Sequence, residues 1–313
     1  MCRLPRRCTS VCWSTVLATG LPSWFIPAFC FVLGLLLGSF LNVVIYRVPL
    51  ARSIVRPGSA CPECGHAVRA YDNIPLVSWL LLRGRCRDCK SPISARYPAV
   101  ELACALLFLD SALHFSALIV ITKTCILSFL MLALIFTDLD HQILPDALTL
   151  PGMAVGFAFA PMVYVEGLPG LRIFPHSMAQ VRALSLFNSL IGAAVGAGLI
   201  YLVGEIYWRL RGVEAMGFGD VKLMGLIGAF LGTRLALLTI FVGSAAGAIA
   251  GVTMIILVYL RRRSRYGNRA RAWHSAKVMY SRFPLPFGVF LGSAALLNAF
   301  WGDRIIQWYF GLF

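Results

Sequence analysis

Long apolar segments constrain this chain more than any other feature. A helix needs about 20 consecutive apolar residues to cross the hydrocarbon core of a bilayer. The chain has eight apolar segments, at residues 24–46, 97–115, 117–137, 145–165, 184–207, 219–233, 235–260 and 284–301. The sixth is short, and only "GTR" at 232–234 separates it from the seventh. None shows the strict alternation of a barrel strand. With 59% hydrophobic residues and a mean hydropathy of +0.80, the chain is predicted to be an all-α, polytopic membrane helix bundle of about eight spans.

The positive charges lie mainly in loops on one side of the predicted bundle. Segments 47–96, 209–222 and 261–282 carry nine, three and eight of the 28 Lys and Arg residues. Loops rich in Lys and Arg stay in the cytoplasm, so both termini are expected to face outward across the cell inner membrane. The net charge of +15 is then explained by topology and by contact with membrane lipid, and no nucleic acid is expected as a partner.

Four of the ten cysteines form a pattern typical of a metal site. Cys61, Cys64, Cys86 and Cys89 make two C-x2-C pairs within the 47–96 loop. Each pair turns two thiolates towards one point, and two pairs complete a tetrahedron. We predict a structural zinc in a cytoplasmic zinc-knuckle loop, because four protein ligands leave no open position; His66 is a spare donor. Two redox dithiols or unpaired cysteines are the alternative, which a reducing cytoplasm disfavours.

Three aspartates follow the third apolar segment, in "TDLDHQILPD" (137–146). Charged side chains close to lipid are costly and indicate a function. Asp138 ends the apolar segment and has a fixed direction, whereas Asp140 points about 200° away on a helix. Asp146 follows a proline and is expected to cap the next helix. Asp138 is therefore the first candidate and Asp140 the second; a solvated acid at the membrane edge is the alternative for all three.

A partner carboxylate lies at the start of the sixth apolar segment, in "GFGD" (217–220). Gly217 and Gly219 lack Cβ atoms and allow a neighbouring backbone or a substrate to approach Asp220, and Lys222 keeps the segment at the interface. Two aspartates that share a site hold one proton between them. The ionised one can activate water, and the protonated one can polarise a peptide carbonyl and protonate the leaving amine. Asp138 and Asp220 are thus predicted to be the catalytic dyad of an aspartic protease.

Five stretches in this order resemble one known family. They are "GSFLNVVIYRVP" (38–49), the cysteine loop (61–89), "SARYPAVEL" (94–102), "DLDHQILPD" (138–146) and "EAMGFGDVKL" (214–223). The chain resembles the type IV prepilin peptidases, which are bacterial leader peptidase and N-methyltransferase enzymes and membrane aspartic proteases with a GxGD motif. By this resemblance the catalytic pair of the family falls on Asp138 and Asp220.

The resemblance implies two reactions. One cleaves the leader from type IV prepilins or type II secretion pseudopilins on the cytoplasmic side. The other methylates the new N-terminal residue, with S-adenosylmethionine as the methyl donor. The resemblance also associates methyl transfer with the cysteine loop and its flanks, where the candidates are Asn42, Arg47, Asp72 and Glu101. An interface anchor is the alternative role of Arg47. Glu101 lies inside a predicted span, where a charge indicates a function or a buried partner; Glu205 raises the same question and has no assignment.

The expected division of the chain has four parts. They are an N-terminal extension (1–23), the first span with the zinc loop (24–102), the membrane aspartic peptidase bundle (103–301) and a C-terminal tail (302–313). Two other functions stay open: a zinc-knuckle scaffold of pilus or secretion assembly without catalysis, and a proton-coupled transporter that uses membrane carboxylates. The transporter is disfavoured, since no internal repeat is apparent and the aspartates lie at one edge. The sequence indicates no oligomeric state.

Overall fold

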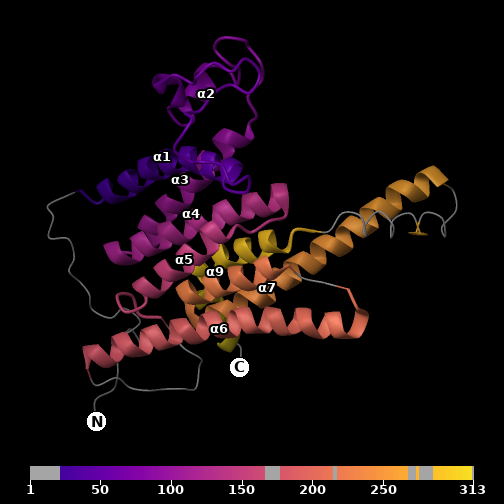
Figure 1. Ribbon diagram of the computed structural model, residues 1–313. Coiled ribbons are helices and arrows are strands. Elements are labelled where there is room, and N and C mark those ends of the chain that lie inside the picture. Colours follow the sequence, from indigo (N-terminus) through magenta and orange to yellow (C-terminus); the bar gives the residue numbers. More distant parts are fainter. Residues whose placement is uncertain (1–21, 166–176, 214–216, 267–272, 275–284, 312–313) are drawn as a thin grey trace.

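The computed structural model describes residues 22–165, 177–213, 217–266, 273–274 and 285–311, and it is helical throughout apart from turns and two isolated bridges (Figure 1). The cysteine loop contains a short 3-10 helix, η1 (Ala70–Asn73), and the short helix α2 (Val77–Leu81). The longer helices are α1 (Phe25–Arg47), α3 (Arg96–His114), α4 (Leu118–His141), α5 (Asp146–Phe159), α6 (Met178–Arg211), α7 (Phe218–Tyr266) and α9 (Phe287–Phe310).

Six of the described helices are long and apolar enough to cross a membrane: α1, α3, α4, α6, α7 and α9. The chain is therefore a multi-pass membrane protein, as its composition predicts. Helix α5 has only 14 residues and covers the first part of the predicted 145–165 segment. Helix α7 breaks at Gly232, whose φ of 75° and ψ of 176° are not helical, so its two parts correspond to the sixth and seventh predicted segments. Most of the predicted N-terminal extension, residues 1–21, lies outside the described residues.

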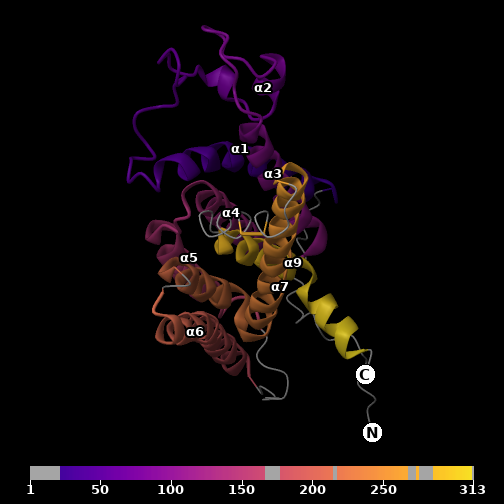
Figure 2. The ribbon, with the colours of Figure 1, turned by 90° about the vertical axis from the view of Figure 1, so that its right-hand side faces the viewer.

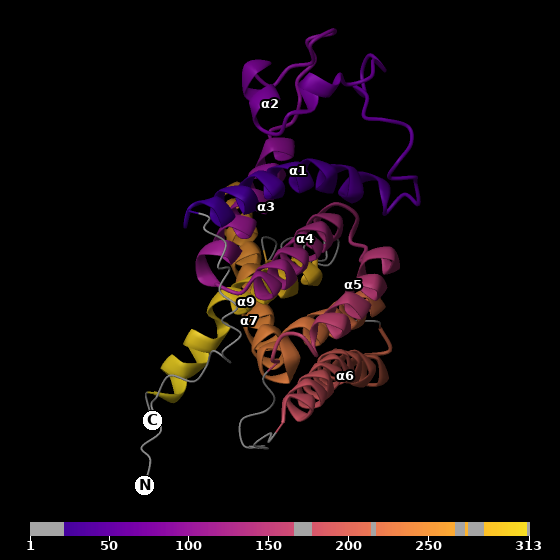
Figure 3. The same ribbon diagram turned by 90° about the vertical axis from the view of Figure 1, so that its left-hand side faces the viewer.

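Helix α4 joins two hydrophobic clusters. Towards one side its Leu127, Met131 and Leu134 pack with residues of α7 and α9. Towards the other side its Leu132 and Ala133 pack with buried residues of α1 and α3. Figures 2 and 3 show α4 between α1 on one side and α5, α7 and α9 on the other. The end of α4, which carries Asp138, is consequently held by both halves of the bundle.

At Gly192 and Gly228, helices α6 and α7 approach each other more closely than a side chain at either position would allow. A Cβ atom added at Gly228 would lie 2.1 Å from the carbonyl oxygen of Gly192. Small residues permit this backbone contact in membrane bundles. The Ser189 hydroxyl group also donates a hydrogen bond of 2.6 Å to the carbonyl oxygen of Ala229. The first part of α7, which begins near Asp220, is thereby fixed against α6.

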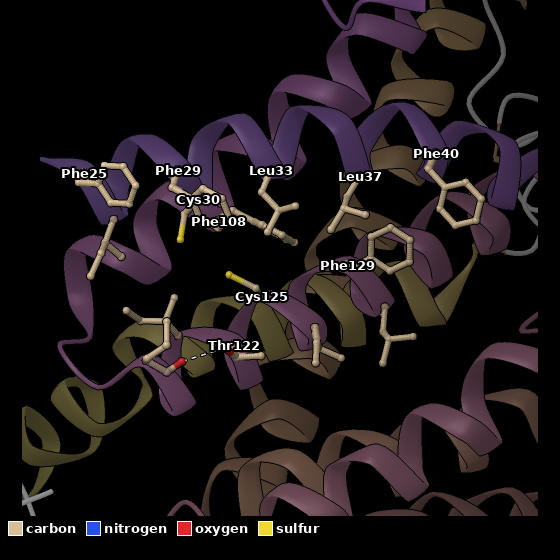
Figure 4. A pocket seen from close by; sticks show the side chains of 15 residues that line it. Phe25, Phe29, Cys30, Leu33, Leu37, Phe40, Phe108, Thr122, Cys125 and Phe129 are labelled. Carbon is tan, nitrogen blue, oxygen red and sulfur yellow. Dashed lines mark hydrogen bonds between the residues drawn. The ribbon is translucent and has the colours of Figure 1, made fainter. Parts of the chain in front are cut away.

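An apolar cavity of about 560 Å³ lies between α1 and α4, with Phe108 of α3 at its back (Figure 4). Its lining is hydrocarbon and sulfur except for Thr122, whose hydroxyl group donates to the carbonyl oxygen of Leu118. Phe129 lines the cavity nine residues before Asp138, and nine residues turn a helix by about 180° beyond full turns. The cavity and Asp138 therefore lie on opposite faces of α4.

Candidate functional site

The two predicted catalytic aspartates lie at neighbouring helix ends. Asp138 is in the last turn of α4 and Asp220 in the first turn of α7, and the residues are only 6% and 8% exposed. Gly219, which precedes Asp220, and Gly288, which lies beside the Asp138 carboxyl group, both pack on the side chain of Leu144, so the two aspartates lie in one region of the bundle. Two buried carboxyl groups in such proximity do not both ionise readily, because like charges repel strongly away from water. Two buried carboxyl groups at neighbouring helix ends are groups that general acid–base chemistry can use.

A third helix reaches this pair. Helix α9 begins at Phe287, and the backbone N–H group of Val289 donates a hydrogen bond of 3.0 Å to Oδ2 of Asp138. A Cβ atom added at Gly288 would lie 2.8 Å from the same oxygen. The absence of a side chain at this position is what allows the helix to approach the carboxyl group.

The loop between α4 and α5 packs against the same place. Leu144 is 9% exposed and fills the space beside two glycines. A Cβ atom at Gly219 would lie 3.0 Å from Cβ of Leu144, and one at Gly288 would lie 3.2 Å from its Cδ1. Leu144 thus connects the amino ends of α7 and α9. The predicted close approach is present at Gly219, whereas a Cβ at Gly217 would meet nothing nearer than the Gly219 nitrogen at 3.9 Å.

The other acids of the first motif are held in ion pairs. Asp146 accepts hydrogen bonds of 2.6 and 2.7 Å from Nζ of Lys222. Pro145, and not Asp146, is the N-cap of α5, and no side chain caps that end; the capping role expected for Asp146 is therefore replaced by a contact with α7. Asp140 pairs with both terminal nitrogens of Arg96 at the start of α3.

The four patterned cysteines converge on one point. Their sulfur atoms all lie within 4.8 Å of one another. A tetrahedral zinc with Zn–S bonds of about 2.3 Å places sulfurs about 3.8 Å apart, and the sulfurs of Cys61 and Cys89 are 3.8 Å apart. The donor set therefore fits zinc, with four thiol ligands. His66 does not belong to this described group.

The two C-x2-C pairs share one backbone conformation. In each, the N–H group of the first cysteine donates a hydrogen bond to the carbonyl oxygen of the residue five positions later. The residue four positions after the cysteine has a positive φ, and its N–H group donates to the carbonyl oxygen of that cysteine. The pairs are Cys61–His66 with Gly65 (φ 71°) and Cys86–Ser91 with Lys90 (φ 60°). Backbone N–H groups of Cys64 and Glu63 lower the pKa of the Cys61 thiol to about 6. That thiol is thus prepared to bind a metal as thiolate near neutral pH.

The chain is similar to known proteins over most of its length. Residues 32–115 match the bacterial peptidase A24 N-terminal domain, and residues 125–252 match the type IV leader peptidase family. A prepilin leader peptidase/N-methyltransferase of Aeromonas hydrophila is 36% identical over 94% of this chain and 96% of its own length. The chain belongs to the type IV leader peptidase family. Enzymes of the same name from Myxococcus xanthus (strain DK1622) and Pseudomonas aeruginosa are 44% and 36% identical, over 76% and 89% of this chain and 67% and 91% of their own lengths. No solved structure matches the chain.

In this member of the type IV leader peptidase family, the residues considered for methyl transfer hold the cysteine loop on the bundle. Asn42 of α1 donates a hydrogen bond of 3.1 Å to the Tyr97 carbonyl oxygen of α3. Arg47 donates to two carbonyl groups of the following loop at 3.0 and 3.3 Å. Glu101 is 8% exposed and accepts a hydrogen bond of 2.8 Å from the Leu76 N–H group. Each residue thus connects different segments.

Asp72 has a corresponding role inside the loop. It forms a bidentate pair with Arg87, at N···O distances of 2.6 to 3.1 Å. The hydrogen bonds from this guanidinium hold the pKa of the Asp72 carboxyl group below its usual value. Glu205, which had no assignment, pairs with Arg209 one turn later at 2.8 Å. The predicted role of the four methyl-transfer candidates stays a prediction.

The contribution of α9 to the site was not predictable from the sequence. The contact between Val289 and Asp138 spans 151 residues and uses a backbone N–H group, which every non-proline residue carries. The proline–phenylalanine–glycine sequence at 286–288 was a signal of a helix start, but it did not indicate which side chain the start faces. Leu144 was missed for a similar reason, because an apolar loop residue has many possible neighbours.

Proposed function

We propose that this chain is a prepilin leader peptidase and N-methyltransferase. It cleaves the leader peptide of type IV prepilins or type II secretion pseudopilins and methylates the new N-terminal residue. The observation that carries the proposal is the meeting of two buried carboxyl groups, Asp138 and Asp220, in a chain whose relatives carry that name. Asp138 and Asp220 are the proposed catalytic residues.

The chemistry follows from one proton shared by the two acids. The ionised carboxylate removes a proton from water, while the protonated carboxyl group hydrogen-bonds to the scissile carbonyl oxygen. Burial excludes bulk water and strengthens both interactions. Lys222 and Gly219 support the site: Lys222 pairs with Asp146, and Gly219 leaves room for Leu144. No metal is required in this step, because the dyad supplies both acid and base.

The active site is proposed to face the cytoplasm. Helices α1 and α6 end at Arg47 and Arg211, and α3 begins at Arg96. Alternation of direction through the bundle places these ends with the end of α4 and the start of α7. The positive-inside rule assigns this side to the cytoplasm. A substrate whose apolar helix lies in the membrane would then present its leader junction at the interface, beside Asp138 and Asp220.

Methyl transfer is assigned to the part of the chain that contains the cysteine loop. Cys61, Cys64, Cys86 and Cys89 would hold a zinc ion, which would stabilise a loop too short to form its own core. S-adenosylmethionine would supply the methyl group. The contacts of the four candidates support this assignment indirectly. Arg47 and Glu101 join the loop to α1 and α3, Asn42 joins α1 to α3, and Asp72 pairs with Arg87 inside the loop.

The decisive experiment uses purified enzyme in lipid vesicles and a prepilin carrying its leader. Asp138→Asn and Asp220→Asn should each reduce cleavage by at least about 10³-fold, because an amide serves neither as base nor as acid. Methylation of an already cleaved substrate should continue in both variants. The control is Asp146→Asn, which removes a nearby acid outside the dyad and should slow cleavage by no more than about fivefold, because it breaks only the partly exposed pair with Lys222. Normal cleavage by either dyad variant would instead support a scaffold without catalysis.

A further inference from the structure

The two carboxyl groups of the dyad have unequal surroundings. Asp138 accepts the Val289 N–H group at 3.0 Å, and the backbone N–H group of Gly288 faces the same carboxyl group. Within the described part of the chain, Asp220 interacts with Asp138 and its carboxyl group receives no hydrogen-bond donor. The dyad is therefore asymmetric before any substrate binds.

The donors on Asp138 come from the first turn of a long helix. Helix α9 runs from Phe287 to Phe310, and the first N–H groups of any helix have no partner inside it. These groups carry a partial positive charge, which favours a carboxylate and disfavours a neutral carboxyl group. In most helices these N–H groups donate to a capping side chain or to water; in α9 the Asp138 carboxyl group takes that place.

Among the described residues, no side chain donates a hydrogen bond to Asp138 or Asp220. Helix α9 has no ionisable residue before Asp303. From α7, the ionisable residues near the site are Asp220 itself and Lys222, which pairs with Asp146 of α5. On α4 the neighbouring Asp140 pairs with Arg96 of α3. The amides of α9 are thus the feature that distinguishes Asp138 from Asp220 among the described residues.

Gly288 is required for the same contact. A Cβ atom there would lie 2.8 Å from Oδ2 and 3.1 Å from Cγ of Asp138. Either the carboxyl group or the helix would have to move, and the hydrogen bond from Val289 would lengthen. The amino end of α9 therefore combines a donor with an open space.

We propose that the amino end of α9 positions Asp138 as the ionised general base and leaves the shared proton on Asp220, the general acid. Val289 acts through its N–H group and Gly288 through its lack of a side chain; both are positioning residues. This assignment rests on the proposed peptidase function and adds to it the individual roles of the two aspartates.

The assignment gives a balanced reaction. Asp138 takes a proton from water as the water oxygen bonds to the scissile carbon, and Asp220 gives its proton to the carbonyl oxygen. The resulting diol then collapses: the C–N bond breaks, the leaving nitrogen receives the proton held by Asp138, and one hydroxyl group of the diol returns a proton to Asp220. The amine is therefore protonated by Asp138 and not, as the sequence suggested, by the initially protonated acid, because Asp220 has already given its proton to the carbonyl oxygen. Both aspartates end in their starting states.

Val289→Pro tests the role of the N–H group. Proline is tolerated in the first turn of a helix but has no N–H group to donate. Cleavage requires ionised Asp138, so loss of the donor should move the acidic limb of the pH–rate profile towards higher pH by about one unit. At one pH unit below the midpoint of the wild-type acidic limb, the ratio of the variant rate to the wild-type rate should consequently be about tenfold lower than the same ratio at the optimum pH. Val289→Ala is the matched control, since it changes the side chain and keeps the N–H group.

Gly288→Ala tests the role of the missing side chain at Gly288. It also tests the role of α9 by itself if Val289→Pro does not accumulate in the membrane. It should shift the same limb in the same direction. An unshifted limb in Val289→Pro, or an equal shift in Val289→Ala, would overturn the proposal. Asp138→Asn is measured in the same assay: if it cleaves normally, the peptidase proposal itself has failed, whereas an inactive Asp138→Asn with an unshifted Val289→Pro overturns only the role assigned to α9.

Discussion

At the scale of single residues, the ion pair between Lys222 and Asp146 is the most informative contact beside the dyad. Lys222 lies two residues after Asp220, and Asp146 begins the helix that follows the Leu144 loop. The Asp146 side chain is 57% exposed and that of Lys222 24%. Solvent screening therefore keeps the energy of the pair small, and its main effect is to hold α5 against the start of α7.

Lys222→Met and Asp146→Asn should each slow cleavage by roughly two- to fivefold, because a partly exposed pair contributes at most about 1 kcal/mol. The double variant should lose no more than the larger single loss, since both changes break one interaction. Initial cleavage rates measure this. Arg209→Met is the matched control, because it breaks the Glu205 pair away from the dyad. Additive losses would show that the two residues act independently.

At the scale of elements, the close contact of α6 with α7 sets the position of Asp220. Gly228→Ala would place a Cβ atom 2.1 Å from the Gly192 carbonyl oxygen. The helices would have to separate, and we expect a destabilisation of about 1–3 kcal/mol. Thermal unfolding of the detergent-solubilised protein measures it. Gly198→Ala on α6 is the control, because its added Cβ meets nothing within 4 Å. Equal melting temperatures of the two variants would contradict the tight packing.

The cysteine loop is an element whose stability should depend on metal. Purified wild-type protein should contain one zinc ion per chain, and Cys61→Ser or Cys86→Ser should lose most of it, since a thiolate ligand is replaced by a weak one. The loop should then become sensitive to protease. Cys104→Ser is the matched control, because Cys104 lies in α3, buried against α1 and outside the loop. A protein without zinc and with four reactive thiols in this loop would refute the metal site.

Much of this arrangement was predictable from local sequence. The eight apolar segments correspond to described helices or helix parts, and the two C-x2-C pairs converge as their spacing indicates. Both features depend on residues close in sequence, for which periodicity and spacing are direct signals. The contact of Val289 with Asp138 and the packing of Leu144 depend on how helices far apart in sequence pack, which no local pattern specifies. The role predicted for Asp146 was wrong for that reason, because its partner lies on another helix.

At the scale of the whole molecule, the charge distribution should determine orientation. A reporter enzyme active only outside the cytoplasm should be inactive when fused after Gly212, between α6 and α7. It should be active after Ser116, between α3 and α4, and after Phe313, because loops rich in Lys and Arg remain inside. Equal full-length expression of the three fusions is the control. Activity of the Gly212 fusion would invert the topology and place the dyad on the outer face.

The last turn of α4 also has a thermodynamic consequence. Asp138 accepts a hydrogen bond from α9, and Asp140 on the same turn pairs with Arg96 of α3. This one helical turn is therefore in contact with both halves of the chain. Any ligand on the α3 side that changes the geometry of this turn must change the affinity for a substrate held at the dyad. Reciprocity then requires that substrate to change the affinity for the first ligand by the same factor. Cleavage and methyl transfer are assigned to separate sites, yet binding of a ligand at one site would then change the binding affinity at the other.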